Sequence, residues 1–249
     1  MTSGPRPPGE AARQRRELRR RFYKEASVVP AQGGFAVGLD GRIAKTPAGK
    51  PLSVASETLA QALAGEWQSQ GDHIDPSRMP LTRIVNAALD RVADEMAAVR
   101  ADIAAYAGND LLSYRAEGPQ SLVDAQDKSW SPLLSWAEDA LGARLVVARG
   151  VMHVAQDKSA IAAIAAEVGR FDVLQLAALH TITTLTGSAI IAIAVARGRL
   201  AVTQAWAAAH VDEDWQMSQW GADAMAMQRR ESRFAEMQAA AFILATAQK

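Results

Sequence analysis

The chain has 249 residues, carries 27 basic and 27 acidic side chains, and contains no cysteine. The lack of cysteine excludes disulfide scaffolds, cysteine-ligated zinc or iron–sulfur sites, and thiol catalysis. With 49% apolar and 22% charged residues, the composition is typical of a globular chain that buries one large core or two unequal ones.

The first 24 residues form a basic segment. Residues 1–25 hold eight arginine or lysine side chains against three glutamates, so the rest of the chain is acidic. Prolines and glycines near the start do not favour a packed element, and we expect residues 1–24 to form a flexible basic tail. No apolar stretch follows the arginines, as a secretory signal would require, and the glutamates are atypical of an organelle transit peptide.

Residues 25–78 indicate a β-rich N-terminal domain with one helix. Short extended segments alternate there with turn-forming residues, and Asp40-Gly41 predicts an antiparallel hairpin because both turn residues must accept positive φ. From Ser56, the expected N-cap, apolar residues recur at helical spacing as far as Trp67. We expect Trp67 to be a structural residue on the buried face of that helix.

Residues 79–249 predict a larger, mainly α-helical domain, so the expected fold class is α+β. The uncharged stretch 173–196 is long enough to cross a bilayer. Its glutamine, histidine, threonines and serine would be costly there, and we interpret it as a buried core helix. The β-branched residues on either side of Gly150 are compatible with one further hairpin. The helices expected are 81–107, 131–142, 158–169, 173–197, 203–220 and 223–247.

Signatures of catalysis are sparse in this chain. No phosphate-binding glycine loop, GxSxG elbow or HExxH pair occurs in the sequence. Asp72, His73 and Asp75 could ligate a metal, but no second cluster completes a coordination shell, and solvated side chains are the plainer interpretation. His210 and Asp214 stand one helical turn apart, as two ligands would, although a surface pair is more typical. We therefore predict no metal site.

The predicted helix over 203–220 is the most informative element. At helical spacing, Trp206, His210, Glu213, Met217 and Trp220 share one face, so a carboxylate lies between two indoles and a thioether. One interpretation is that the tryptophans anchor the core and the acids face water. The other is a recognition surface, because Trp and Met are enriched at protein contacts and nearby acids would select a basic partner patch. We assign Trp206 a structural role.

Six groups of residues follow one another along most of the chain. They are Arg21-Phe22-Tyr23-Lys24, Leu39-Asp40-Gly41-Arg42 with Lys45-Thr46-Pro47, Glu66-Trp67, Met79-Pro80-Leu81-Thr82, Asp110-Leu111-Leu112-Ser113-Tyr114-Arg115, and Asp212-Glu213-Asp214-Trp215-Gln216 with Trp220-Gly221. In their order and joint occurrence these motifs resemble the assembly chaperones of the ATP synthase α subunit, called ATP synthase assembly factor two in mitochondria. The resemblance runs from about Arg21 to about Glu236.

The resemblance implies a non-enzymatic, ATP-independent chaperone that has a small β-rich domain and a larger helical domain. It implies that the protein binds the newly made α subunit and shields the surface that later faces a β subunit. Neither catalytic residues nor a cofactor are implied, and we expect a monomer. The expected partner-binding residues are Asp212, Glu213, Asp214, Trp215, Trp220, Asp223, Glu66 and Arg115.

Two other classes of function stay open as alternatives. One is a small-molecule or metal-dependent hydrolase that uses His210 with Asp212 or Asp214. The other is a nucleic-acid adaptor that uses the arginine-rich tail and binds with a steep salt dependence. We expect neither nucleic-acid binding nor membrane insertion, and we expect a cytoplasmic bacterial protein, or a protein of the mitochondrial matrix if the source is a eukaryote.

Overall fold

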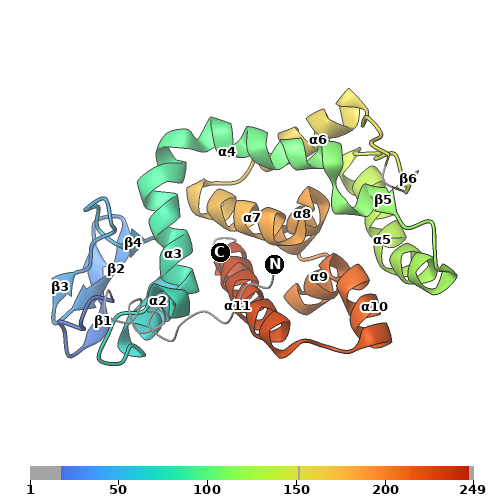
Figure 1. Ribbon diagram of the computed structural model, residues 1–249. Helices are drawn as coiled ribbons and strands as arrows, with labels where there is room; N and C mark the ends of the chain where they lie inside the picture. Colours follow the sequence, from blue (N-terminus) through green and yellow to red (C-terminus); the bar gives the residue numbers. More distant parts are fainter. Residues whose placement is uncertain (1–17, 151, 247–249) are drawn as a thin grey trace, which may run out of the picture. The chain divides into compact units, whose positions relative to one another are not determined.

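The computed structural model describes residues 18–150 and 152–246 (Figure 1). The chain divides into two compact units, Met1–Arg83 and Ile84–Lys249. This division falls inside helix α3 (Pro80–Ala87), a few residues beyond the boundary expected after residue 78. The first unit contains a small antiparallel sheet and the second is mainly helical, which confirms the predicted α+β class.

The sheet of the first unit is built around strand β2, which pairs antiparallel with each of the other three strands. At the turn between β2 and β3, Asp40 and Gly41 have φ values of 48° and 78°, a region that glycine enters without strain and aspartate tolerates. The predicted hairpin is therefore confirmed. The strands are β1 (Ala26–Ala31), β2 (Gly34–Leu39), β3 (Arg42–Ile43) and β4 (Ser53–Val54).

Helix α2 (Glu57–Gln68) packs against β1 and β2. Ser56 is its N-cap, and the Ser56 Oγ accepts a hydrogen bond from the Leu59 amide at 3.3 Å. Leu59 and Leu63 are buried against the sheet, and burying side chains of this size stabilises a fold by about 1.5–3 kcal/mol each. Trp67 is half-buried, and its ring lies 5.8 Å from that of Tyr23 between centroids.

Residues 18–24 belong to this unit, so the expectation of a flexible tail as far as residue 24 is wrong. Tyr23 is buried, and its hydroxyl donates to the Trp67 carbonyl at 2.6 Å. The Arg21 guanidinium donates to several backbone carbonyls of the unit. An arginine whose donors are satisfied in this way contributes to the fold rather than to a solvated segment. The rest of the expected tail, residues 1–17, lies outside the described residues.

Helix α7 is the central element of the second unit and contacts α4, α8 and α11 (Figure 1). Its buried side chains include Leu176, Leu179 and Ile182, and alanines on the same helix allow close approach of its neighbours. A π-helical turn, η2 (Ala88–Val92), links α3 to α4. The other helices are α4 (Ala93–Tyr106), α5 (Gln120–Leu141), α6 (Lys158–Val168), α7 (Val173–Thr186), α8 (Ala189–Ala196), α9 (Val202–Ala209), α10 (Val211–Trp220) and α11 (Ala224–Thr246).

The expected helix over 173–197 is two helices, because Gly187 adopts a φ of 69° and ends α7. Ser188 then caps α8, and its Oγ accepts from the Ile191 amide at 3.0 Å. Both helices are buried, as predicted for this uncharged stretch. Within the described ranges, no helix combines the length and the hydropathy that a membrane crossing requires.

Asp110 fixes the start of α8 from a distant part of the chain. Its carboxylate accepts from the Leu112 amide at 3.1 Å and from the Ile190 amide at 3.3 Å. Burial raises the pKa of Asp110 to about 6, although these hydrogen bonds act in the opposite direction. The carboxyl group is thus a structural cap for a helix 80 residues further along the chain.

The residues around Gly150 do not form the expected hairpin. Strand β6 (Ala148–Arg149) pairs in parallel with β5 (Tyr114–Arg115), and the Gly150 amide donates to the Arg115 carbonyl at 2.9 Å. The residues that pair with this distant strand are Ala148 and Arg149, neither of which is β-branched, and Val146 and Val147 stay exposed. The helix expected over 131–142 is also longer than predicted, because α5 begins at Gln120 and continues through Pro132.

Candidate protein-interaction site

The expected helix over 203–220 is broken at His210, which has a φ of −121° and a ψ of 23°. The Nδ1–H of His210 donates to the Trp206 carbonyl at 2.8 Å, so this side chain competes with the backbone for a helical acceptor. The break ends the register between Trp206 on α9 and Trp220 on α10. The single stripe predicted for one continuous helix is therefore wrong.

Trp206 faces the core of the second unit. It is 8% exposed, and its ring centroid lies 3.8 Å from that of His210 and 5.2 Å from that of Phe234. Trp130 is distant from these residues in the sequence, but its indole N–H donates to the carbonyl of Ala208 on α9 at 2.7 Å. These contacts give Trp206 a structural role.

His210 does not form the pairs that a hydrolase centre would need. Its side chain is buried, and its Nε2 lies 3.9 Å from Glu213 rather than beside Asp212 or Asp214. Burial lowers the pKa of His210, which favours the neutral imidazole. Asp212 and Asp214 bind other side chains, so the geometry does not support hydrolysis by His210 with these two carboxylates.

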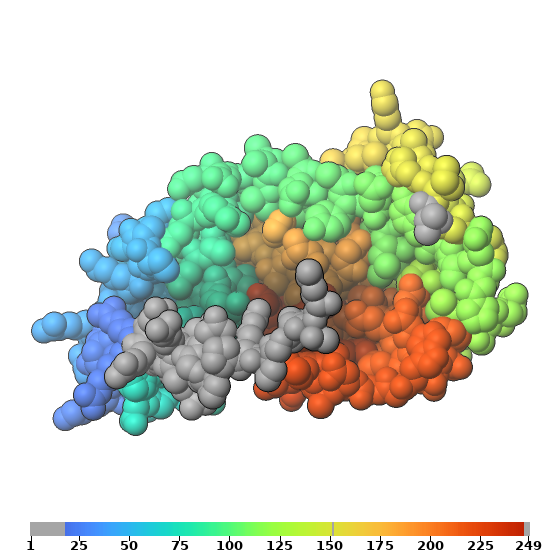
Figure 2. All heavy atoms as spheres, viewed as in Figure 1, coloured from blue at the N-terminus to red at the C-terminus, as the bar shows by residue number. Residues whose placement is uncertain are grey.

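Helices α10 and α11 enclose a surface groove of about 460 Å³. Gly221, with a φ of 86°, ends α10, and the Asp223 Oδ1 accepts from the Met225 amide at 2.9 Å at the start of α11. Both helices, orange to red in Figure 2, form part of the molecular surface. We call this hollow the Trp220 groove; it is lined by Glu213, Gln216, Met217, Trp220, Gly221, Asp223, Ala226, Met227, Arg229, Arg230 and Arg233.

Large apolar side chains stay exposed at the Trp220 groove. Trp220 and Met227, which line the groove, are 76% and 43% exposed, and Met225 on the first turn of α11 is 68% exposed although it does not line the groove. Trp215 stands edge-on to Trp220, with ring centroids 5.8 Å apart and planes at 87°, and its Nε1 donates to the Ser121 Oγ at 3.0 Å. Apolar clusters of this kind mark sites of interaction, and tryptophan is prominent among residues that dominate binding energy.

Charged side chains of both signs surround these apolar groups. Arg230 forms an ion pair with Asp214, and Arg233 donates to a backbone carbonyl at 2.8 Å. Glu213 and Arg229 are exposed. The groove is therefore mixed in charge, which corrects the expectation of an acidic surface that selects a basic partner patch.

Asp212 is directed away from the Trp220 groove. Its Oδ1 accepts from the Gln126 Nε2 at 2.7 Å, and the Gln126 Oε1 accepts from the Ala116 amide at 2.8 Å. These bonds join α10 to α5 and to the segment before it. Asp212 is thus an anchor of α10, and its expected role in partner binding stays a prediction.

Arg115 is also a structural residue. Its side chain is buried, its Nη1 donates to the Gln126 carbonyl at 2.9 Å, and its guanidinium lies 4.9 Å from the centre of the Trp130 ring. The Asp127 carboxylate lies 3.9 Å from the Arg115 Nε. Burial lowers the pKa of Arg115 from its usual range. Arg115 is therefore held inside the protein by these contacts, and its expected role in partner binding stays a prediction.

Glu66 caps the first turn of α3, which lies in the same unit as Glu66. Its two carboxylate oxygens accept from the amides of Leu81 and Thr82, each at 2.8 Å, at the start of α3. Burial raises the pKa of Glu66, and the two amides partly offset this shift. A carboxylate here also interacts favourably with the positive end of the helix dipole. Both oxygens are therefore used inside the protein, and the expected role of Glu66 in partner binding stays a prediction.

The metal candidates weighed from the sequence are engaged in local structure. Across residues 18–150 and 152–246, no group of three or more histidine, aspartate or glutamate side chains is placed to hold a metal ion. The Asp75 Oδ1 accepts from the amide and the hydroxyl of Ser77, and His73 forms a backbone bridge with Arg20. The carboxylate of Asp75 thus begins the short helix η1 (Pro76–Arg78).

Three of the residues expected to bind a partner, Glu213, Trp220 and Asp223, line the groove. A fourth, Trp215, contacts the ring of Trp220. Sequence reasoning did not single out the methionines of α11. A signal was present, because Met225 and Met227 are two residues apart on a helix and therefore point in different directions. Two large apolar residues with that spacing cannot both face a single core.

Comparison with known proteins places the chain among chaperones. Residues 20–138 match the family model described as ATP12 chaperone protein. The protein atp12, mitochondrial, of Schizosaccharomyces pombe is 25% identical over 214 residues, which cover 81% of this chain and 74% of that relative.

Solved structures are more similar still. The crystal structure of Atp12 from Paracoccus denitrificans has a TM-score of 0.84 and 42% identity, and covers 92% of this chain and 98% of that chain. An aspartate-to-lysine mutant of the same Paracoccus protein matches at 41% identity. A candidate chaperone of Agrobacterium tumefaciens has a TM-score of 0.88 and 45% identity, and covers 98% of this chain and 92% of that chain.

Proposed function

Because the chain belongs to the ATP12 chaperone family, whose members act in ATP synthase assembly, we propose that it is the assembly chaperone of the α subunit of the catalytic head. It binds the newly made subunit without ATP and shields the surface that later faces a β subunit. Both the choice of the α subunit and the independence from ATP come from the resemblance of the motifs described above, and both are open to direct measurement.

The observation that carries this proposal is the exposed Trp220, which lines the groove together with Met217 and Met227. These side chains form an unfinished apolar surface, and the groove between α10 and α11 can accept a side chain from a partner. An unassembled subunit exposes an apolar interface that promotes aggregation until it is covered. Contact between two such surfaces removes both from water, which is favourable by about 25 cal/mol for each Å² of apolar area.

The mixed charge of the Trp220 groove suits a partner that must later be released. Permanent interfaces are larger and more apolar than transient ones. The exposed side chains of Glu213 and Arg229 must lose water when a partner binds, and this desolvation offsets part of the binding free energy. The affinity therefore stays moderate. The β subunit can then displace the chaperone by competition, and no nucleotide hydrolysis is needed for the exchange.

The test is suppression of α-subunit aggregation by the purified protein, followed by light scattering without added nucleotide. We expect the unchanged protein to suppress scattering and Trp220→Ala to bind the subunit roughly thirtyfold more weakly, which corresponds to about 2 kcal/mol for a residue at the centre of an interface. Met152→Ala is the matched control, because Met152 is also 76% exposed but does not line the groove.

The outcomes separate the function from the site. If the unchanged protein neither retains the α subunit nor slows its aggregation, the proposed function is wrong. If it does both but Trp220→Ala acts like Met152→Ala, the function stands and the Trp220 groove is not the site. A requirement for ATP would contradict the proposed mechanism of release.

We further propose that the protein acts as a monomer in the cytoplasm of a bacterium. Support for a bacterial setting comes from the similarity to proteins of Paracoccus and Agrobacterium, while the relative from Schizosaccharomyces is mitochondrial by name. Size-exclusion chromatography with light scattering should give a mass of about 27 kDa, since the chain mass is 26.6 kDa. A concentration-independent mass of twice that value would show a dimer.

A further inference from the structure

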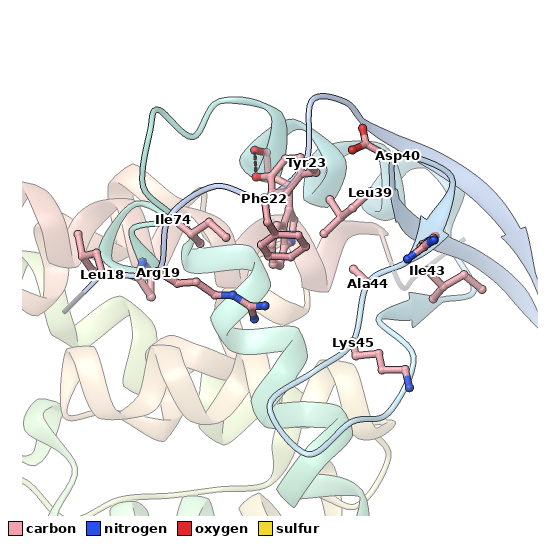
Figure 3. A pocket seen from close by; sticks show the side chains of 13 residues that line it. Leu18, Arg19, Phe22, Tyr23, Leu39, Asp40, Ile43, Ala44, Lys45 and Ile74 are labelled. Atoms are coloured by element: carbon pink, nitrogen blue, oxygen red, sulfur yellow. Dashed lines mark hydrogen bonds between the residues drawn. The ribbon is translucent and has the colours of Figure 1, made fainter. Parts of the chain in front are cut away.

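The first unit carries a groove of its own, of about 810 Å³ (Figure 3). Its wall contains the buried side chains of Tyr23, Leu39, Ala44 and Ile74. These residues come from the segment before β1, from β2 and β3 with their continuation, and from the loop after α2. We call this hollow the hairpin groove. Every residue that lines it lies between 18 and 76, so it belongs to the first unit alone.

Two large apolar side chains line the hairpin groove and yet stay exposed. Phe22 is 54% exposed, and Ile43 on the edge strand β3 is 42% exposed. In Figure 3 the ring of Phe22 and the side chain of Ile43 lie on opposite sides of Ala44 and Leu39. An apolar ligand that contacts both Phe22 and Ile43 would remove both side chains from water, which favours binding in proportion to the apolar area covered.

The rim of the hairpin groove is basic. Arg19, Arg42 and Lys45 are exposed and line it, and among described residues neither Arg42 nor Lys45 has an ion-pair partner. Asp40 is the acid among the lining residues, but its Oδ1 accepts from the amides of Lys24 and Glu25. Those hydrogen bonds hold the pKa of Asp40 below its usual range, and they keep its carboxylate at the end of β2.

We propose that the hairpin groove binds a polypeptide segment in which aspartate or glutamate alternates with large apolar residues. The three cations of the rim attract the carboxylates, and the apolar wall accepts the side chains between them. This inference goes beyond the proposed function, because it concerns a surface on the other unit and holds whichever protein the Trp220 groove binds.

The same groove is poorly suited to nucleic acid or to the chain's own start. Base stacking needs an open aromatic face, but the Arg19 guanidinium lies 4.4 Å from the centre of the Phe22 ring and covers one face. Two other aromatic residues line the groove, but Tyr23 is buried and Trp67 is half-buried, and the remaining apolar lining residues are aliphatic. Residues 1–17 contain four arginines and two glutamates, so their net charge has the same sign as the rim.

The test uses the full chain and a fluorescein-labelled peptide of three Asp-Leu-Glu-Phe repeats, with binding followed by fluorescence anisotropy. We expect saturable binding that weakens with added salt, and a loss of about tenfold or more in affinity for the double variant Arg42→Glu with Lys45→Glu. Ile43→Ser should also weaken binding, because it removes apolar contact. Lys158→Glu on α6 is the control for a charge reversal elsewhere, and it should change the affinity by less than about twofold.

Four results would overturn the proposal. They are equal or tighter binding of a matched peptide of Lys-Leu-Arg-Phe repeats, tighter binding of an oligothymidylate, an affinity unchanged by the double variant, and binding of the acidic peptide that is lost in a chain lacking residues 1–17. Circular dichroism should show native helix content for each variant, since Arg42, Ile43 and Lys45 are all exposed. Suppression of α-subunit aggregation is measured separately, so failure here leaves the proposed function standing.

Discussion

Glu66→Ala should destabilise the first unit, because the variant loses the acceptor of two backbone amides. Among the described residues, the Glu66 carboxylate is the only side-chain group that accepts from the amides of Leu81 and Thr82. Loss of a helix cap costs about 0.5–2 kcal/mol. Thr82 is 4% exposed, so water cannot easily replace the lost acceptor, and an unsatisfied buried donor costs about 1–3 kcal/mol. Relief of the burial that raises the pKa of Glu66 offsets part of this loss. We expect a net loss of about 2–3 kcal/mol.

The assay is urea unfolding followed by far-ultraviolet circular dichroism, with the unfolding free energy obtained by linear extrapolation. Amide hydrogen exchange at Leu81 and Thr82 gives an independent local measurement, and both amides should lose protection in Glu66→Ala. Gln61→Ala is the control, because Gln61 is exposed on the same helix and its replacement should change stability by less than about 0.5 kcal/mol.

The reasoning is refuted if Glu66→Ala keeps its full unfolding free energy and the two amides stay protected. Binding of the α subunit then becomes decisive for the residue. A variant that is fully stable but no longer retains the subunit would restore the role in partner binding that the sequence suggested. A variant that is less stable, but binds normally where it is folded, would assign Glu66 to the cap alone.

Four further variants test the second unit. Trp206→Ala should lower the unfolding free energy by about 3–5 kcal/mol, and a loss below about 1 kcal/mol in urea would contradict its place in the core. Gly187→Ala should cost about 1–2 kcal/mol, because its φ of 69° strains a residue with a Cβ; no change in melting temperature would argue against the break between α7 and α8. Glu213→Lys should weaken retention of the α subunit while circular dichroism stays unchanged, and unfolding would instead identify Glu213 as an interior group. The pKa of Asp110 is raised to about 6, so protonation of this carboxyl stabilises the fold fully below the unfolded pKa of 3.8, and that stabilisation is lost as the pH rises through 6. Relative to Asp110→Asn, the unfolding free energy of the unchanged protein should therefore fall by up to about 3 kcal/mol between pH 4 and pH 7. If urea unfolding gives the same difference between the two proteins at both pH values, this prediction is refuted.

Local patterns predicted those elements whose causes lie within a few residues. The Asp40-Gly41 hairpin follows from the φ values that two turn residues require, and α2 follows from the Ser56 cap and the helical spacing of its leucines. Periodicity also placed α6 and α11 within a residue or two of their observed ends. The break at Gly187 could have been predicted, since glycine followed by serine is a typical end and restart of a helix.

The features that sequence reasoning missed depend on contacts between distant segments. The break at His210 comes from a side chain that takes a backbone acceptor inside a buried cluster. Glu66 and Arg115 were assigned to a partner surface from the resemblance of their motifs to the family, and such a resemblance does not show what a side chain contacts. Their actual partners lie on α3 and α5, and neither pairing can be found without knowing which elements are neighbours. The hairpin groove was missed for the same reason.

The division of the chain into two units, each with its own groove, affects how a partner could leave. When a polypeptide is bound at one groove, the other groove meets it at a high effective concentration. Two weak contacts can therefore give a high overall affinity with no additional contact. Once a competitor frees either end, the remaining contact has only its own modest residence time. Dissociation would then be stepwise, with one groove released before the other, and its rate would depend on the concentration of the competitor.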